Sequence, residues 1–278
     1  MAERIWIEAD GARLAGTLHR PARAAAVAVV LHGATGVPQG FYQAFAAWLA
    51  EARDAVVLTY DYRDFGASAT GHPRDSRATL ADWGLRDQAA AQAAVEGAAP
   101  GLPLWVIGHS LGGLMLPFQP GAGRVDRLIA VASGPNHVSD HPWSYWPMAL
   151  SFWHGHGYLA TRAMGYLPGK LGGLGEDLPA GVYLQWRRWC TTPGFYRSDI
   201  GTHLPAPDWA ALRAPARLVA VSDDQLIPPA TMVRMDAIYP AADKTHVTVR
   251  PSDAGLRGLG HIGVLARRNA AIWPKLIG

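Results

Sequence analysis

The sequence lacks the features that mark disulfide-rich, membrane-spanning and secreted proteins. Its only cysteine, Cys190, cannot form a disulfide within the chain, and nothing around it resembles a catalytic cysteine motif, so we expect a packed, inert thiol. No apolar run approaches the length of about 20 residues that spans a bilayer. Residues 1–10 carry Glu3, Arg4 and Glu8 and no apolar stretch, so we expect no signal peptide. These absences favour a cytoplasmic protein without stable membrane insertion.

Excess charge of either sign is also missing. The 25 Lys and Arg residues nearly balance the 22 Asp and Glu residues, which leaves a formal net charge of +3. The arginines are scattered and form no basic stripe, so a nucleic acid is not an expected partner. Hydrophobic residues make up 49% of the 278 positions, enough for one large core or a core with a subdomain. Nothing in the sequence indicates an oligomeric state.

Strand-like apolar runs alternate with helix-like segments along most of the chain. The runs cover 26–31, 55–59, 104–107, 127–133, 217–222 and 246–250, and a hairpin over 5–9 and 14–19 with an Asp10-Gly11 turn precedes them. Helices are expected at 41–52, 80–96 and 229–239, and a terminal helix is expected to open at 259. Such alternation predicts an α/β fold, with a mostly parallel sheet flanked by helices.

The alternation stops at Gly134 and resumes near residue 215. Residues 135–214 hold six of the eleven tryptophans and no regular strand–helix pattern. We therefore expect three segments: a first part of an α/β core over 1–134, a cap or lid over 135–214, and the second part of the core over 215–278.

One pentapeptide indicates nucleophilic chemistry. Gly108-His109-Ser110-Leu111-Gly112 fits the pattern G-x-S-x-G and directly follows the apolar run 104–107. Glycines on both sides allow a tight strand-to-helix turn that holds the Ser110 hydroxyl out at the end of the sheet. The start of the expected helix would aim its free N–H groups at the same place.

A serine nucleophile needs a base, an orienting acid and donors for the oxyanion. His261, in a Gly-rich loop after the last strand, is the candidate base, and Asp224 is the preferred acid because of its spacing to Pro228. Asp223 is expected to be solvated or to form a turn. The oxyanion donors are expected to be the N–H groups of Leu111 and of Ala34, which follows His32-Gly33. All of these residues follow predicted strands, so they converge on one rim of the sheet.

With these residues identified, the chain resembles an α/β-hydrolase over nearly its whole length. Within that superfamily it is similar to the serine-aminopeptidase and monoglyceride-lipase-like group of predicted hydrolases. The resemblance implies an eight-stranded sheet with a mainly helical cap inserted after the sixth strand. Pro117 and Pro120 depart from the family pattern, because they shorten or kink the helix after the serine; Asp64-Phe65 departs too, without an evident meaning. The resemblance rests on 32–34, 60–68, 108–113, 224–228 and 260–261.

Aromatic residues of the cap segment would lie over Ser110. Most of them are expected to pack the cap on the core, but a few should line a pocket that favours a hydrophobic substrate. The candidates for substrate contact are His32, Gly33, Trp143, Trp146, Trp153 and Trp186. For Arg187-Arg188 we favour a structural ion pair or a solvated face over a grip on a substrate carboxylate. We expect no cofactor and no metal: His137, His141, His154, His156 and His203 are candidate ligands, but they have no nearby Cys or clear carboxylate partner.

The predicted function is hydrolysis of a carboxylic ester of a small to medium hydrophobic substrate. Ser110 would form an acyl-enzyme, with His261 as base and Asp224 as its partner. Amide or peptide, thioester and carbon–carbon bond hydrolysis and acyl transfer use the same triad and stay open as alternatives. A slow-turnover ligand-binding or signalling protein is an alternative of another class.

Overall fold

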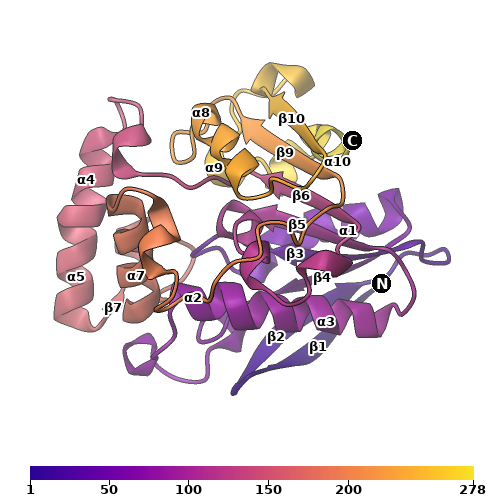
Figure 1. Ribbon diagram of the computed structural model, residues 1–278, viewed down its shortest axis with the longest axis horizontal. Helices are drawn as coiled ribbons and strands as arrows, with labels where there is room; N and C mark the ends of the chain where they lie inside the picture. The colour runs from indigo at the N-terminus through magenta and orange to yellow at the C-terminus, as the bar shows by residue number, and fades with distance from the viewer.

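Eight strands form one twisted sheet in the computed structural model, which describes residues 1–278 (Figure 1). The order across the sheet is β1-β2-β4-β3-β5-β6-β9-β10. β2 pairs antiparallel with both β1 and β4, and all other neighbouring strands are parallel. The strands are β1 (Ala2–Ala9), β2 (Ala12–His19), β3 (Val27–His32), β4 (Ala55–Tyr60), β5 (Leu104–His109), β6 (Arg127–Val131), β9 (Ala216–Val221) and β10 (Lys244–Val249).

The apolar pattern explains which strands lie at the centre. All residues of β3 and β4 are buried, as expected for strands covered by helices on both faces, whereas the edge strand β1 is mostly exposed. Two apolar clusters fill the two faces. One contains side chains of α1 (Gln43–Ala52) and α10 (Trp273–Ile277), and the other contains side chains of α3 (Gln88–Ala98) and α8 (Pro229–Met232). The predicted α/β class is confirmed.

Three predicted helices are less regular than the sequence pattern suggests. The helix expected over 80–96 consists of α2 (Leu80–Asp82), a π-helical turn over 83–87 and α3, which run on without a break. The segment 229–239 holds only the four-residue α8 and a 3-10 turn over 233–237. Instead of a long terminal helix, α9 (Gly260–Gly263) is followed by a 3-10 segment and α10. None of the helices combines the length and the hydropathy needed to span a membrane.

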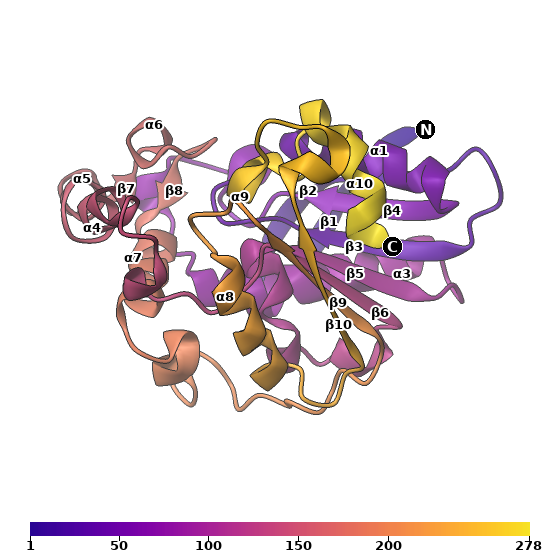
Figure 2. The ribbon, with the colours of Figure 1, turned by 90° about the horizontal axis from the view of Figure 1, so that it is seen from above.

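The residues between β6 and β9 form a separate helical lobe beside the sheet (Figures 1 and 2). We use the name helical lobe for residues 135–214. Its elements are α4 (Trp146–His154), α5 (His156–Met164), β7 (Tyr166–Leu167), α6 (Gly169–Gly172), β8 (Leu178–Pro179) and α7 (Ala180–Thr191). β7 and β8 pair antiparallel, and α7 contacts α2 of the core.

A buried carboxylate holds the helical lobe together and to the core. One oxygen of Asp199 accepts hydrogen bonds from Gln185 Nε2 at 2.8 Å, Trp189 Nε1 at 2.8 Å and Arg188 Nη2 at 2.5 Å. Gln185 Oε1 in turn accepts the N–H of Ala81, at the start of α2, at 2.8 Å. Burial alone would raise the pKa of Asp199, but the hydrogen bonds from these donors together lower it. Arg188 therefore has the structural role expected for this pair of arginines.

Asp199→Asn is expected to lower the free energy of unfolding by about 2 kcal/mol at neutral pH, because it removes the charge opposite Arg188 and one acceptor. Since the folded-state pKa of Asp199 lies below its ordinary value, this stabilisation is present above a pH of about 4 and is lost as the pH falls through the folded-state pKa. Urea unfolding at pH 7 and pH 3, beside the exposed control Asp75→Asn, measures both effects. A wild-type-to-variant difference that is the same at both pH values contradicts the assignment.

Candidate active site

Ser110 lies on a strained turn at the carboxyl end of β5. Its φ of 55° is in the left-handed region, which non-glycine residues occupy rarely and at a cost. The two flanking glycines are needed for space. A Cβ at Gly112 would overlap the carbonyl oxygen of His32, and a Cβ at Gly108 would overlap the Gly112 carbonyl group. The G-x-S-x-G spacing thus has the steric basis that the sequence analysis inferred.

The chain after Ser110 forms a 3-10 turn over 110–113 and not a long helix. Two further 3-10 turns follow, over 116–118 and 122–124, so the expected shortening at Pro117 extends to the whole helix. The expectation of a helix whose dipole points at the nucleophile is corrected accordingly, because a single short turn carries little dipole. The Leu111 N–H, at the start of the turn, donates no hydrogen bond within the chain and remains available.

The turn after β9 presents Asp224 to His261. Asp224 Oδ2 accepts the Nδ1–H of His261 at 2.8 Å, and Oδ1 accepts the N–H groups of Leu226 and Ile227 at 2.8 and 2.9 Å. Both side chains are buried. In the neutral form of His261, Nδ1 is therefore the protonated nitrogen, and Nε2 is left to act as a base.

Asp223 has a different part in the same loop. Its two oxygens accept the N–H groups of Leu259 and Gly260 at 2.8 and 3.0 Å. It therefore anchors the loop that carries His261. Of the two neighbouring carboxylates, only Asp224 contacts the imidazole. The sequence analysis had expected only a solvated or turn-forming role for it.

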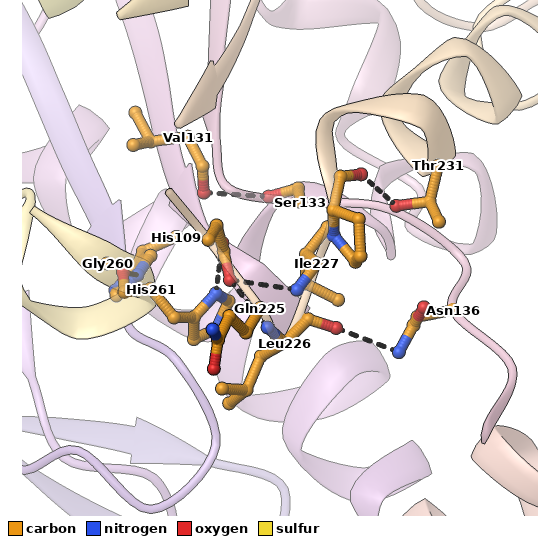
Figure 3. Close-up of polar contacts among 12 residues, drawn as sticks. His109, Val131, Ser133, Asn136, Gln225, Leu226, Ile227, Thr231, Gly260 and His261 are labelled. Carbon is orange, nitrogen blue, oxygen red and sulfur yellow. Dashed lines mark hydrogen bonds and ion pairs between the residues drawn. The ribbon is translucent and has the colours of Figure 1, made fainter. Parts of the chain in front are cut away.

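Asn136 and His141 hold the Asp224 turn from the other side. Asn136 Nδ2 donates to the carbonyl of Leu226 at 2.9 Å (Figure 3), and His141 Nδ1 donates to the carbonyl of Gln225 at 2.9 Å. Both residues belong to the linker between β6 and α4. The segment that leads into the helical lobe therefore fixes the turn that carries Asp224, which we call the acid turn. No local sequence pattern predicts this contact.

Ser110 borders a small cavity of about 30 Å³. Its Oγ makes no hydrogen bond within the chain, to His261 or to any other residue, and His261 Nε2 makes none either. His261 is buried and is not among the residues that line the cavity. The walls come from the core and from the helical lobe, and they include Thr35, Leu111, Asn136, Trp186, Cys190 and Phe195.

The expected second oxyanion donor is already engaged. The N–H of Ala34 donates to the hydroxyl of Tyr42 at 2.9 Å. The next residue, Thr35, lines the cavity and its N–H has no partner within the chain. In this structure the free donors near Ser110 are therefore the N–H groups of Leu111 and Thr35, and the expectation for Ala34 is corrected.

A hydrogen-bonded chain joins the Ala34 loop to the His261 loop. Because the His261 carbonyl can only accept, the His109 Nε2 that lies 3.0 Å from it must carry the proton. His109 Nδ1 is then an acceptor, and the Tyr42 hydroxyl donates to it at 2.8 Å while accepting from Ala34. Burial lowers the pKa of His109 to about 3, helped by the nearby His261, so this order of protons persists at neutral pH. The sequence analysis did not identify Tyr42 or assign a role to His109.

The residues predicted to contact substrate lie in different places. Trp186 lines the Ser110 cavity as expected. Trp143 is 87% exposed and Trp146 is 45% exposed, on the outside of the helical lobe, and Trp153 packs against Phe152, Tyr183 and Trp186. The expectation that Trp143, Trp146 and Trp153 contact the substrate is therefore corrected.

His32 and Gly33 are structural as well. His32 is fully buried and its Nδ1 lies 2.7 Å from the Tyr60 hydroxyl, while burial lowers its pKa to about 3. The carbonyl of Gly33 accepts from the Tyr62 hydroxyl at 2.9 Å, and a Cβ at Gly33 would touch the ring of Tyr42. The expectation that His32 and Gly33 contact the substrate is therefore corrected: they shape the loop before Thr35.

The remaining candidates carry no metal or thiolate chemistry in this arrangement. No group of three or more His, Cys, Asp or Glu side chains is placed to hold a metal ion. His137 bonds to Ser139, His156 to Ser151, and His154 lies beside Arg187. Burial raises the pKa of the Cys190 thiol well above its usual range, so the thiol stays protonated.

Tyr42→Phe is expected to lower the free energy of unfolding by about 2 kcal/mol, because it leaves the Ala34 N–H and His109 Nδ1 buried without partners. Tyr158→Phe is the matched control, since the Tyr158 hydroxyl makes no hydrogen bond and its loss should cost less than about 0.5 kcal/mol. Urea unfolding measures both. Equal stability of the two variants would show that the Tyr42 hydroxyl does not connect the loops.

Comparisons with known proteins agree with this architecture. Similar solved structures include an enol-lactonase from Burkholderia xenovorans LB400, with a TM-score of 0.60, 14% identity and 98% of each chain covered. The N-formylmaleamic acid deformylase from Pseudomonas putida S16 has a TM-score of 0.60 and 18% identity, and the match covers 99% of this chain and 100% of that one. A thermophilic esterase from Thermogutta terrifontis has a TM-score of 0.55 and 17% identity, and the match covers 99% of this chain and 98% of that one. No curated protein sequence matches the chain. The family model described as "Alpha/beta hydrolase family" matches residues 28–272, and the chain belongs to that family.

Proposed function

We propose that the chain is a serine hydrolase that cleaves a carboxylic ester through an acyl-enzyme on Ser110. The observation that carries the proposal is the buried Asp224–His261 pair, whose His261 carbonyl is bonded to His109, the residue before a serine in a strained backbone conformation. A neutral imidazole with a free Nε2 and an unbonded hydroxyl are the two partners that nucleophilic catalysis needs. A cytoplasmic location is part of the proposal, since the one thiol of the chain is free and buried.

The proposed reaction has two steps. Ser110 Oγ attacks the ester carbonyl while His261 Nε2 takes its proton; the C–O bond to the alcohol then breaks and His261 gives the proton to the leaving oxygen. Water attacks the acyl-enzyme in the second step, again with His261 as base. Asp224 accepts from Nδ1–H throughout and stabilises the imidazolium. The developing oxyanion is bound by the N–H groups of Leu111 and Thr35, the two that are free beside the cavity.

The small cavity indicates the size of the acyl group. The small volume of this cavity, about 30 Å³, favours a short acyl group over a long chain. Trp186 and Phe195 of the helical lobe line the same cavity as Ser110. Within the expected range of small to medium hydrophobic substrates, we therefore favour the small ones.

Hydrolysis of a small amide is a second candidate. Asn136 is buried at the cavity wall, and its Oδ1 has no hydrogen-bond partner. Because Nδ2 is bound to the Leu226 carbonyl, Oδ1 is correctly identified as the free acceptor. An amide substrate would bring an N–H donor to this acceptor, whereas a simple ester would not.

Turnover of p-nitrophenyl acetate and p-nitrophenyl octanoate tests the proposal. The wild type is expected to prefer the acetate, and Ser110→Ala to lose at least roughly 10⁴-fold in kcat. The matched variant Ser252→Ala, at an exposed serine after β10 and away from the Ser110 cavity, should keep wild-type turnover. Equal turnover by wild type and Ser110→Ala contradicts Ser110 as the nucleophile.

Asp224→Asn and Asp223→Asn separate the two carboxylates. Asp224→Asn is expected to lower kcat about 10⁴-fold, because an amide cannot hold the imidazole in the required tautomer or stabilise its charged form. Asp223→Asn should have a much smaller effect on kcat, since it touches only backbone N–H groups. Losses of equal size would contradict the assigned roles. Steady-state kinetics with p-nitrophenyl acetate measures both.

A further inference from the structure

A second cavity, of about 380 Å³, lies where the helical lobe meets the core. Its walls come from the β6–α4 linker over 135–140, the turn over 194–197, Trp209 and the residues 234–238 after α8. Ser139, Arg197 and Arg234 on its wall are exposed, so the cavity opens to solvent. Nothing in the proposed acyl-transfer steps uses this space.

Two side chains separate this outer cavity from the inner cavity at Ser110. Asn136 and Phe195 line both spaces, and both residues are buried. The outer cavity therefore lies directly behind the wall of the nucleophile's cavity. A substrate that enters from solvent by this side has only the Asn136–Phe195 partition to pass.

The backbone of Phe195 is in a strained conformation. Its φ is 58°, in the left-handed region, where a bulky side chain is a genuine outlier. Its ring packs on Trp189 and Tyr196, which holds it in place between the two cavities that it lines. The preceding Gly194, with φ of 86°, gives the turn one position that can change conformation without a Cβ clash.

The charges at the outer cavity favour an anion. Arg234 is neutralised by a two-pronged ion pair with Asp140, at 2.5 and 2.6 Å. The guanidinium of Arg197 makes no ion pair and no hydrogen bond in the structure, although it lines the same cavity. One unpaired guanidinium at the mouth of a pocket is suited to bind a carboxylate.

We propose that the outer cavity is a leaving-group subsite that takes the carboxylate-bearing alcohol or amine of a small acyl ester or amide, with Arg197 as its anion contact and Phe195 as the gate to Ser110. The proposal rests on the proposed serine hydrolase function and adds the substrate class. The inner cavity holds the small acyl group at Ser110, and the outer cavity holds the group that leaves. After the first step the released alcohol or amine departs through the same opening.

Two esters of similar phenols test the subsite. 3-Acetoxybenzoate carries the carboxylate on its leaving group and phenyl acetate lacks it. The wild type is expected to have the higher kcat/KM for 3-acetoxybenzoate, and Arg197→Gln is expected to lower the ratio of the two kcat/KM values about fivefold, the size of an exposed ion pair. Arg162→Gln, at another exposed arginine of the helical lobe without an ion pair, is the control and should keep the ratio. A ratio unchanged by Arg197→Gln overturns the anion contact.

The gate is tested with Phe195→Ala and the milder Phe195→Leu. Both are expected to raise kcat/KM for phenyl butyrate relative to phenyl acetate, because a smaller side chain merges the two cavities. An unchanged ratio in both variants overturns the gate.

Binding to the inactive protein separates failure of the subsite from failure of the hydrolase function. Calorimetric titration of Ser110→Ala with 3-hydroxybenzoate needs no chemistry. Binding that Arg197→Gln weakens about fivefold supports the subsite even if neither ester is cleaved by the wild type. Absence of binding overturns the subsite. In that case, turnover of phenyl acetate by the wild type would still support the proposed hydrolase function.

Discussion

The close approach of the Ser110 turn to the end of β3 is the constraint on which the site depends. Gly112 lies so near the His32 carbonyl that no larger residue fits, and the tight turn holds Ser110 in the left-handed region. Leu111 and Thr35, whose N–H groups we propose as oxyanion donors, both line the small cavity beside Ser110. Donors stabilise an oxyanion best when they are fixed before it forms, and the steric contact between the two strand ends would hold these two in place.

The other loops of the site are joined to this centre by ordered hydrogen bonds. Tyr42 and His109 link the Ala34 loop to the His261 carbonyl, and Asp223 holds the backbone just before His261. Asn136 connects the acid turn to the linker of the helical lobe. Together with His141 it ties the linker of the helical lobe to the acid turn, and Asn136 also forms part of the wall between the two cavities.

Much of the fold could be predicted from the sequence because it depends on local patterns. Continuous apolar runs identified the central strands, and the glycine spacing around Ser110 has a purely steric cause. Asp224 and His261 were paired because parallel strands end at one edge. The roles of Tyr42, His109 and Asn136 depend on contacts between distant segments and leave no periodic signal. Exposure of Trp143 and Trp146 could not be foreseen, since aromatic composition does not tell which face of a helix is covered.

The central claim is that Ser110 is activated by His261, and active-site labelling tests it most directly. Intact-mass measurement after treatment with a small fluorophosphonate reports one covalent adduct per activated serine. We predict a single adduct on the wild type, located to Ser110 by peptide mapping, none on Ser110→Ala, and strongly slowed labelling of His261→Ala. An unlabelled wild type, or equal labelling of wild type and Ser110→Ala, would contradict the account.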